Sequence, residues 1–291
     1  MKDIDKFTQD LLEVLQDLPP ESHLPYIKRR LGEIEDTEQR NTAEILISIG
    51  IEVGFKSQPN EEVIVLIHGI RTFAEWFDLI KNEIESNSNA SVYFIKYGYL
   101  DVVRFWFPIW TRSHTIKHVK QQLRIIRDKH RTDDFVIVAH SFGTYIVSKI
   151  LETESDIDIK RLLLCGSIIR ENYRWDLLPK PPSPVLNDCG LRDNWPIVAK
   201  TLSWGYGTSG SFGLNSTHIT NRYFDLNHSG FFTEDFIRKY WMPYIIDKKI
   251  EPSPLSVERP KPFWVKSLIS ILPIQWVILI VAFAFLGKSF F

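Results

Sequence analysis

The sequence predicts an α/β protein: a mostly parallel sheet with helices on both faces, preceded by an N-terminal helical region and followed by one transmembrane helix. Three observations predict it. Between residues 61 and 247, apolar runs typical of buried strands alternate with segments of helical spacing. Residues 1–60 carry helical spacing alone. Residues 263–288 contain a long uncharged apolar run behind a proline-rich linker at 248–262.

The first 60 residues predict a small helical region. Apolar side chains such as Ile4, Phe7 and Leu11 recur at helical spacing, which predicts helices over residues 3–18 and about 24–50. Nothing in this stretch resembles an arrangement of catalytic groups. We therefore expect a packing layer, or a surface that binds a protein partner.

The region 61–247 supplies the sheet. Parallel strands that are buried on both faces are expected to be continuous apolar runs rather than alternating ones. Four runs are expected to be such strands, at residues 63–67, 91–97, 135–139 and 161–167, and later pieces near residues 184–188 and 218–225 are expected to supply two more strands. Helices are expected between the earlier strands, at residues 73–86, 114–130 and 143–154. The alternation predicts helices on both faces of the sheet.

The C-terminal region predicts a membrane anchor. Residues 268–286 carry no charge, and a helix of that length spans about 28 Å, close to the thickness of a bilayer's hydrocarbon core. Lys266 before the run and Lys288 after it fit interfacial anchoring. Pro273 and the mid-span Trp276 leave open the alternative that the segment lies in the interface.

Composition excludes some functions. Lys and Arg number 35 against 36 Asp and Glu, so the near-zero net charge gives no field that would attract nucleic acid. The two cysteines show neither a disulfide framework nor metal-ligand spacing, and no cofactor or metal is expected. The N-terminus is unlike a secretory signal, so we expect the region before the anchor to lie in the cytoplasm.

The most informative stretch is A-H-S-F-G at residues 139–143. An apolar strand precedes it and a helical segment follows it, so Ser141 falls on a sharp strand-to-helix turn that exposes its hydroxyl. Small flanking residues are needed there, and the sequence has Ala139 and Gly143. The context predicts Ser141 as a nucleophile.

A serine nucleophile needs a base and a group that orients the base. His228 is the expected base, because it follows the last strand and precedes a helical segment. Asp193 is the expected acid, since it falls in a loop after the preceding strand. Asp188, nearer the strand edge, stays open as the alternative.

Backbone N–H groups must also stabilise the oxyanion that forms during acyl transfer. Phe142, directly after the nucleophile, is expected to supply one donor. The second is expected after the first strand of the sheet, where H-G-I-R places Ile70 or Arg71 behind a flexible Gly69.

Taken together, H-G-I-R-T, A-H-S-F-G-T, G-L-R-D and N-H-S-G-F-F occur in the order typical of the α/β-hydrolase superfamily, and residues 61–247 resemble its lipase and esterase branch. One of the two usual glycines around the serine is replaced by Ala139. The resemblance implies an α/β-hydrolase fold, acyl transfer to Ser141, and hydrolysis of the acyl-enzyme by water. It does not identify the ester.

Two segments bear on the substrate. Trp106, Phe107 and Trp110 lie in the connection after the second strand and could line an acyl pocket, although a hydrophobic packing helix explains them equally well. The glycine-rich segment 205–213 lacks the Lys of a nucleotide-binding loop and is expected to be a mobile loop near the base.

The main hypothesis is a membrane-anchored serine hydrolase that cleaves a lipid or other hydrophobic acyl ester. Two alternatives stay open. One is a thioesterase that removes acyl groups from proteins or carriers with the same residues. The other is a catalytically inactive scaffold of the same fold, held at the membrane.

Overall fold

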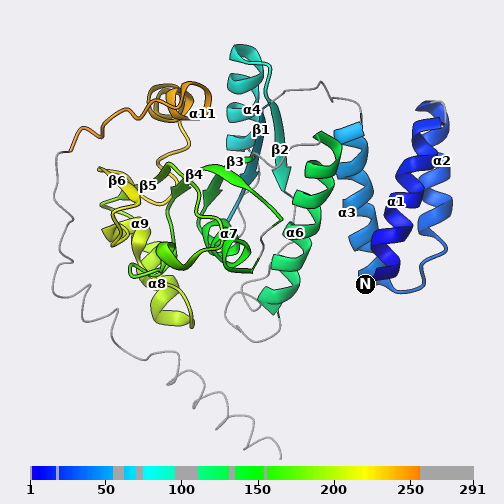
Figure 1. Ribbon diagram of the computed structural model, residues 1–291, viewed down its shortest axis with the longest axis horizontal. Helices are drawn as coiled ribbons and strands as arrows, with labels where there is room; N and C mark the ends of the chain where they lie inside the picture. The colour runs from blue at the N-terminus through cyan, green and yellow to red at the C-terminus, as the bar shows by residue number, and fades with distance from the viewer. Residues whose placement is uncertain are drawn as a thin grey trace, which may run out of the picture. The chain divides into compact units, whose positions relative to one another are not determined.

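The computed structural model describes residues 2–17, 20–54, 62–69, 75–95, 111–130, 135–153 and 156–255 (Figure 1). The chain divides into two compact units, one formed by residues 1–61 with 117–133 and the other by residues 62–116 with 134–291. No helix within the described ranges is long and apolar enough to cross a membrane. The predicted span at 268–286 lies outside those ranges.

The first unit is helical, as the sequence predicts, but the helix expected at about 24–50 is two helices separated by a turn at residues 32–36. It contains α1 (Lys2–Asp17), α2 (Pro20–Leu31), α3 (Thr37–Gly54) and the C-terminal part of α6 (Thr111–His130). The apolar residues at helical spacing form its core, because they share one face of each helix. The buried members are Ile4, Leu11, Leu15, Leu31, Ala43, Leu46 and Ile47.

The second unit is built on a six-stranded sheet in the order β2-β1-β3-β4-β5-β6, and every pairing is parallel. The strands are β1 (Val63–Ile67), β2 (Ser91–Ile95), β3 (Phe135–His140), β4 (Ile159–Cys165), β5 (Val185–Gly190) and β6 (Ile219–Phe224). All six overlap the predicted strands, with ends that differ by at most two residues. β1, β3 and β5 are buried along their whole length, which explains why their sequences do not alternate.

Helices cover both faces of this sheet. The chain steps from β1 through α4 (Glu75–Asn87) to β2 in one direction, and from β3 through α7 (Phe142–Thr153) to β4 in the other. Because such crossovers are right-handed, the two steps place α4 and α7 on opposite faces.

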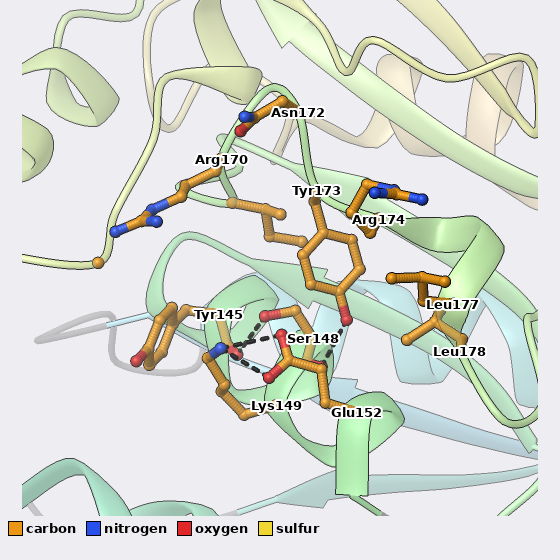
Figure 2. Close-up of a pocket in the computed structure, with 12 residues that line it drawn as sticks. Tyr145, Ser148, Lys149, Glu152, Arg170, Asn172, Tyr173, Arg174, Leu177 and Leu178 are labelled. Atoms are coloured by element: carbon orange, nitrogen blue, oxygen red, sulfur yellow. Dashed lines mark hydrogen bonds and ion pairs between the residues drawn. The ribbon is translucent and has the colours of Figure 1, made fainter.

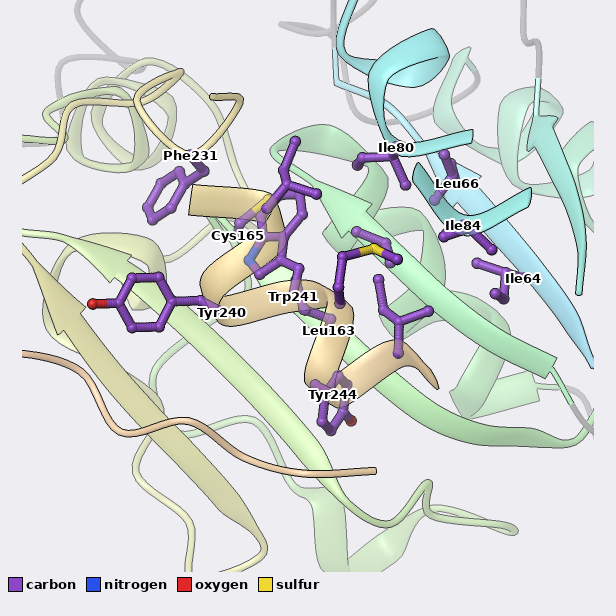
Figure 3. Packing of buried hydrophobic residues seen from close by; sticks show 14 of the residues in the cluster. Ile64, Leu66, Ile80, Ile84, Leu163, Cys165, Phe231, Tyr240, Trp241 and Tyr244 are labelled. Atoms are coloured by element: carbon purple, nitrogen blue, oxygen red, sulfur yellow. The ribbon is translucent and has the colours of Figure 1, made fainter. Parts of the chain in front are cut away.

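One hydrophobic core of this unit lies on the α4 face. Side chains of the strands, such as Ile64 and Leu163, pack there against Ile80 and Ile84 of α4 (Figure 3). Trp241 also belongs to this core. It comes, with the core residues adjacent to it in sequence, from three successive helical segments, α10 (Glu234–Phe236), η2 (Ile237–Trp241) and α11 (Met242–Asp247). The remaining helical segments are η1 (Trp175–Leu177), α8 (Trp195–Leu202) and α9 (Ser209–Phe212).

The strand order determines where a site is expected. β1 lies between β2 and β3, and the chain leaves it toward β2 before crossing to β3. Ligands of open parallel sheets bind outside the carboxyl ends of the strands at such a reversal. Ile67 pairs with Ala139 at these ends, so His68 and Gly69 emerge beside His140 and Ser141.

Candidate active site

Ser141 occupies a strained turn at the carboxyl end of β3. Its φ is 53°, in the left-handed region that non-glycine residues seldom adopt. The turn is held because the Ser141 amide donates to the carbonyl of Cys165 at 3.1 Å and the Ser141 carbonyl accepts from the Thr144 hydroxyl at 2.6 Å. This is the backbone that the sequence pattern around Ser141 predicts.

The two glycines near Ser141 are required by close contacts. A Cβ on Gly143 would lie 2.4 Å from the carbonyl oxygen of Ile67, so the first turn of α7 approaches β1 only because that atom is missing. A Cβ on Gly69 would lie 2.6 Å from the Cβ of Ser141. Both glycines therefore bring β1 and the serine turn together.

His228 and Asp193 meet at the same edge of the sheet. The Nδ1 of His228 lies 2.8 Å from the Oδ2 of Asp193, which is fully buried, while 15% of the His228 side chain stays exposed. The other oxygen of Asp193 accepts from the Trp195 amide at 2.9 Å. An imidazole held through Nδ1 by a buried carboxylate has its Nε2 left for chemistry.

Gly166 allows the imidazole to lie against the end of β4. Its φ is +53°, and a Cβ there would lie 2.8 Å from the Cε1 of His228. Ser141 takes its amide partner from Cys165, the residue before Gly166. The serine turn and the imidazole therefore flank the same strand end, although no hydrogen bond joins the Ser141 hydroxyl to His228 in the described part of the chain. In unliganded enzymes such bonds are often long and tighten when substrate binds.

Asp188, the alternative acid, has different partners. Its carboxylate forms a buried two-pronged ion pair with Arg222, with N–O distances of 2.7 and 2.8 Å. It also accepts from the indole N–H of Trp241 at 2.8 Å. These bonds tie β5 to β6 and to η2, so the structure places Asp193 rather than Asp188 on His228.

A second histidine, His140, lies within the site and was missed by the sequence analysis. Its Nε2 lies 3.1 Å from the carbonyl oxygen of His228, and the two rings are 4.6 Å apart. A carbonyl only accepts, so Nε2 carries the hydrogen and the ring is neutral or doubly protonated. Burial, and secondarily the nearby His228, holds the pKa of His140 well below its ordinary value, which selects the neutral form. Its position directly before Ser141 was the only signal in the sequence.

His68, at the end of β1, is also kept neutral. Burial lowers its pKa to about 4, against a smaller raising effect of its hydrogen bond to the Gly69 carbonyl. Its ring lies 5.1 Å from that of Phe94 on β2.

The predicted oxyanion donors are only partly described. Phe142 is fully buried and begins α7, so its amide lies at the positive end of the helix dipole. Ile70 lies outside the described residues, as do Trp106, Phe107 and Trp110 of the predicted substrate pocket.

The glycine-rich segment 205–213 is packed, and the prediction of a mobile loop is wrong. It contains α9, and a Cβ on Gly210 would lie 2.2 Å from the Ser167 amide nitrogen. The Ser209 hydroxyl donates to that of Ser167 at 2.8 Å. The glycines serve close backbone packing on the end of β4, a role that sequence does not distinguish from looseness.

A cavity of about 480 Å³ lies elsewhere, along the outer face of α7 (Figure 2). Tyr145 and Lys149 of that helix face Tyr173 and Leu177 across it, and none of Ser141, Asp193 and His228 lines it. Within the described ranges, no group of three or more His, Cys, Asp or Glu side chains is placed to hold a metal ion.

Comparison with known proteins adds little. No protein-family model matches the chain, and no curated protein matches it. A structure of a gene product from Listeria innocua is similar at 13% identity and a TM-score of 0.41, covering 67% of this chain and 97% of that one. A predicted CIB-like hydrolase from Thermoplasma acidophilum is similar at 16% identity and a TM-score of 0.43, covering 62% and 85%. Likenesses this distant carry no argument about function.

Proposed function

We propose that the chain is a serine hydrolase that cleaves a hydrophobic acyl ester through an acyl-enzyme on Ser141. One observation carries the proposal. A serine held at a φ of 53° on the turn after β3 lies at the same sheet edge as an imidazole bonded to a buried carboxylate. Nucleophile, base and orienting acid are the parts that acyl transfer requires.

The proposed reaction assigns one role to each group. The Ser141 oxygen attacks the ester carbonyl carbon while His228 Nε2 takes its proton, and the carbonyl π electrons move to the oxygen. When the intermediate collapses, the electron pair of the breaking C–O bond goes to the alcohol oxygen, which takes the proton from His228. Water then attacks the acyl-enzyme by the same steps, releasing the acid and free Ser141. The Asp193 carboxylate orients the imidazole and stabilises the imidazolium.

The proposed oxyanion donors are the amides of Phe142 and Ile70. Phe142 is supported by its place at the start of α7, where a developing negative charge meets the helix dipole. Ile70 is supported by its place in the sequence, directly after Gly69, and by the close approach of Gly69 to Ser141.

The substrate class and membrane attachment are proposed from the sequence. The uncharged run at 268–286 would anchor the chain by its C-terminal side, with the catalytic unit on the cytoplasmic face. Trp106, Phe107 and Trp110 would form an acyl pocket close to lipid substrates. The N-terminal helices would be free to bind a protein partner.

Steady-state hydrolysis of p-nitrophenyl esters by the full chain in detergent micelles tests the proposal. Ser141→Ala and His228→Ala are each expected to lower kcat by at least about 10⁴-fold, because the triad acts as a unit. His218→Ala is the matched control, because His218 is an exposed histidine directly before β6, and this variant should keep the wild-type rate. A Ser141→Ala protein as active as wild type would overturn the proposal.

A further inference from the structure

Trp195 is an exposed aromatic residue beside the candidate base. Trp195 is the first residue of α8 and is 62% exposed, which is unusual for the largest apolar residue. Its ring centroid lies 6.2 Å from that of His228, with the planes tilted by 45°. Single exposed apolar residues are common on protein surfaces, so its place next to the imidazole is what distinguishes Trp195.

The main chain of Trp195 is hydrogen-bonded to the candidate site. Its amide donates to Asp193, the carboxylate that holds His228. Val198, one helical turn later and 37% exposed, lies on the same face of α8. The two side chains give α8 a short apolar surface that begins at His228.

The chemistry of acyl transfer decides which part of a substrate meets this surface. The imidazolium must deliver its proton to the leaving oxygen, so that oxygen comes within hydrogen-bond reach of His228 Nε2. The group attached to the leaving oxygen therefore lies on the His228 side of the scissile bond. The acyl chain extends from the carbonyl carbon, which is bonded to Ser141.

We propose that Trp195 and Val198 bind the alcohol part of the ester, and that they select an apolar or aromatic leaving group. This inference rests on the proposed function and adds a specificity site to it. It assigns the α8 surface to the alcohol and leaves the acyl chain to other residues.

Two series of esters separate the halves of the substrate. In one, acetate is esterified with ethanol, butanol, hexanol and benzyl alcohol; in the other, ethanol is esterified with acids of two to six carbons. The full-length wild-type protein is expected to show kcat/KM rising along the alcohol series. Trp195→Ala should lower the ratio of kcat/KM for hexyl acetate to that for ethyl acetate about tenfold, mainly by raising KM for hexyl acetate. The change of kcat/KM along the acyl series should stay as in wild type.

Matched variants test the residue. Trp195→Phe should keep most of the preference, since it retains an apolar ring. Leu177→Ala is the control, because Leu177 is 67% exposed and lines the cavity on α7 instead of the site. In Leu177→Ala, kcat/KM should change along the alcohol series and along the acyl series as it does in wild type.

The outcomes distinguish this inference from the proposed function. If fluorophosphonate labels wild type and Trp195→Ala equally but the alcohol preference is unchanged, or the acyl slope falls by the same factor, the assignment of α8 to the leaving group is wrong. If Ser141 is not labelled in wild type, the proposed function fails and the inference fails with it.

Discussion

His140 makes a side-chain contact with the main chain of His228. Its Nε2–H donates to the His228 carbonyl at 3.1 Å, and burial keeps the ring neutral. A neutral neighbour is important because a charged one, 4.6 Å from the base, would oppose formation of the imidazolium during the reaction. We interpret His140 as a positioning residue that acts through His228.

Replacing His140 should change turnover more than binding. His140→Phe keeps a ring but removes the donor, and we expect kcat to fall about tenfold with little change in KM, because the base shifts from its productive position. His140→Gln places an amide N–H at a similar distance from the backbone and should restore most of kcat. Equal losses in both variants, in step with a lowered melting temperature, would indicate a packing role only.

β5 and the turn after it carry two buried aspartates with different partners. Asp188 pairs with Arg222 and Trp241, while Asp193 holds His228. An interior charge that loses its partner is strongly destabilising, whereas the loss of an orienting carboxylate chiefly affects catalysis. Replacing Asp188 should therefore chiefly lower stability, and replacing Asp193 should chiefly lower the rate of catalysis.

Asp188→Ala should lower the free energy of unfolding by about 3–5 kcal/mol, because Arg222 would stay buried without its carboxylate. Asp193→Asn should lower kcat by about 10⁴-fold with a much smaller effect on unfolding, because the amide favours the wrong tautomer of His228. Urea denaturation and ester hydrolysis of both variants check this. The reverse pattern would show that Asp188 is the orienting acid.

The strands were predictable, whereas the sequence favoured Asp193 as the acid by its place in a loop and left Asp188 open. Buried parallel strands such as β1 and β3 are continuous apolar runs, so composition alone identifies them. The choice between Asp188 and Asp193 depends on Arg222 and His228, which are more than 30 residues away along the chain. Local sequence contains no information about such partners.

The same reason explains His140 and the glycine-rich segment. His140 looks like the end of a strand, and its partner is 88 residues further along the chain. Gly210 looks like part of a loose loop, although it lies against the Ser167 backbone. Tertiary contacts decide both, and the pattern around Ser141 was predictable because its strand, turn and helix are consecutive.

Two buried histidines should make the fold less stable in mild acid, above the pH at which carboxylates ordinarily take up protons. The pKa of His68 is lowered to about 4 and that of His140 is also lowered, so the unfolded chain takes up protons near pH 6.5 that the folded protein does not. The contribution of these two neutral histidines to stability is therefore present in full above that pH and decreases as the pH falls from about 6.5 toward 4.

For His68, the loss between about pH 7.5 and pH 5 should be roughly 2 kcal/mol. Urea denaturation at the two pH values measures it, and His68→Gln should reduce the difference by about that amount. A free energy of unfolding in His68→Gln that falls as steeply as in wild type would show that His68 is not responsible.

Membrane attachment can be tested on the full chain. A charge near the centre of the 268–286 run should cost about 3 kcal/mol on insertion, so Ile278→Arg with Ile280→Arg is expected to move the protein from the membrane pellet to the supernatant. Ser256→Arg, in the proline-rich linker, is the matched control and should stay in the pellet. Unchanged fractionation of the double variant would contradict the anchor.

The mass of the intact protein after incubation with a fluorophosphonate tests the central claim most directly. We expect one adduct per chain, located on the peptide that contains Ser141, absent from Ser141→Ala and formed far more slowly in His228→Ala. A wild-type protein with native circular dichroism that gains no mass, or that is labelled equally well without Ser141, would contradict the account.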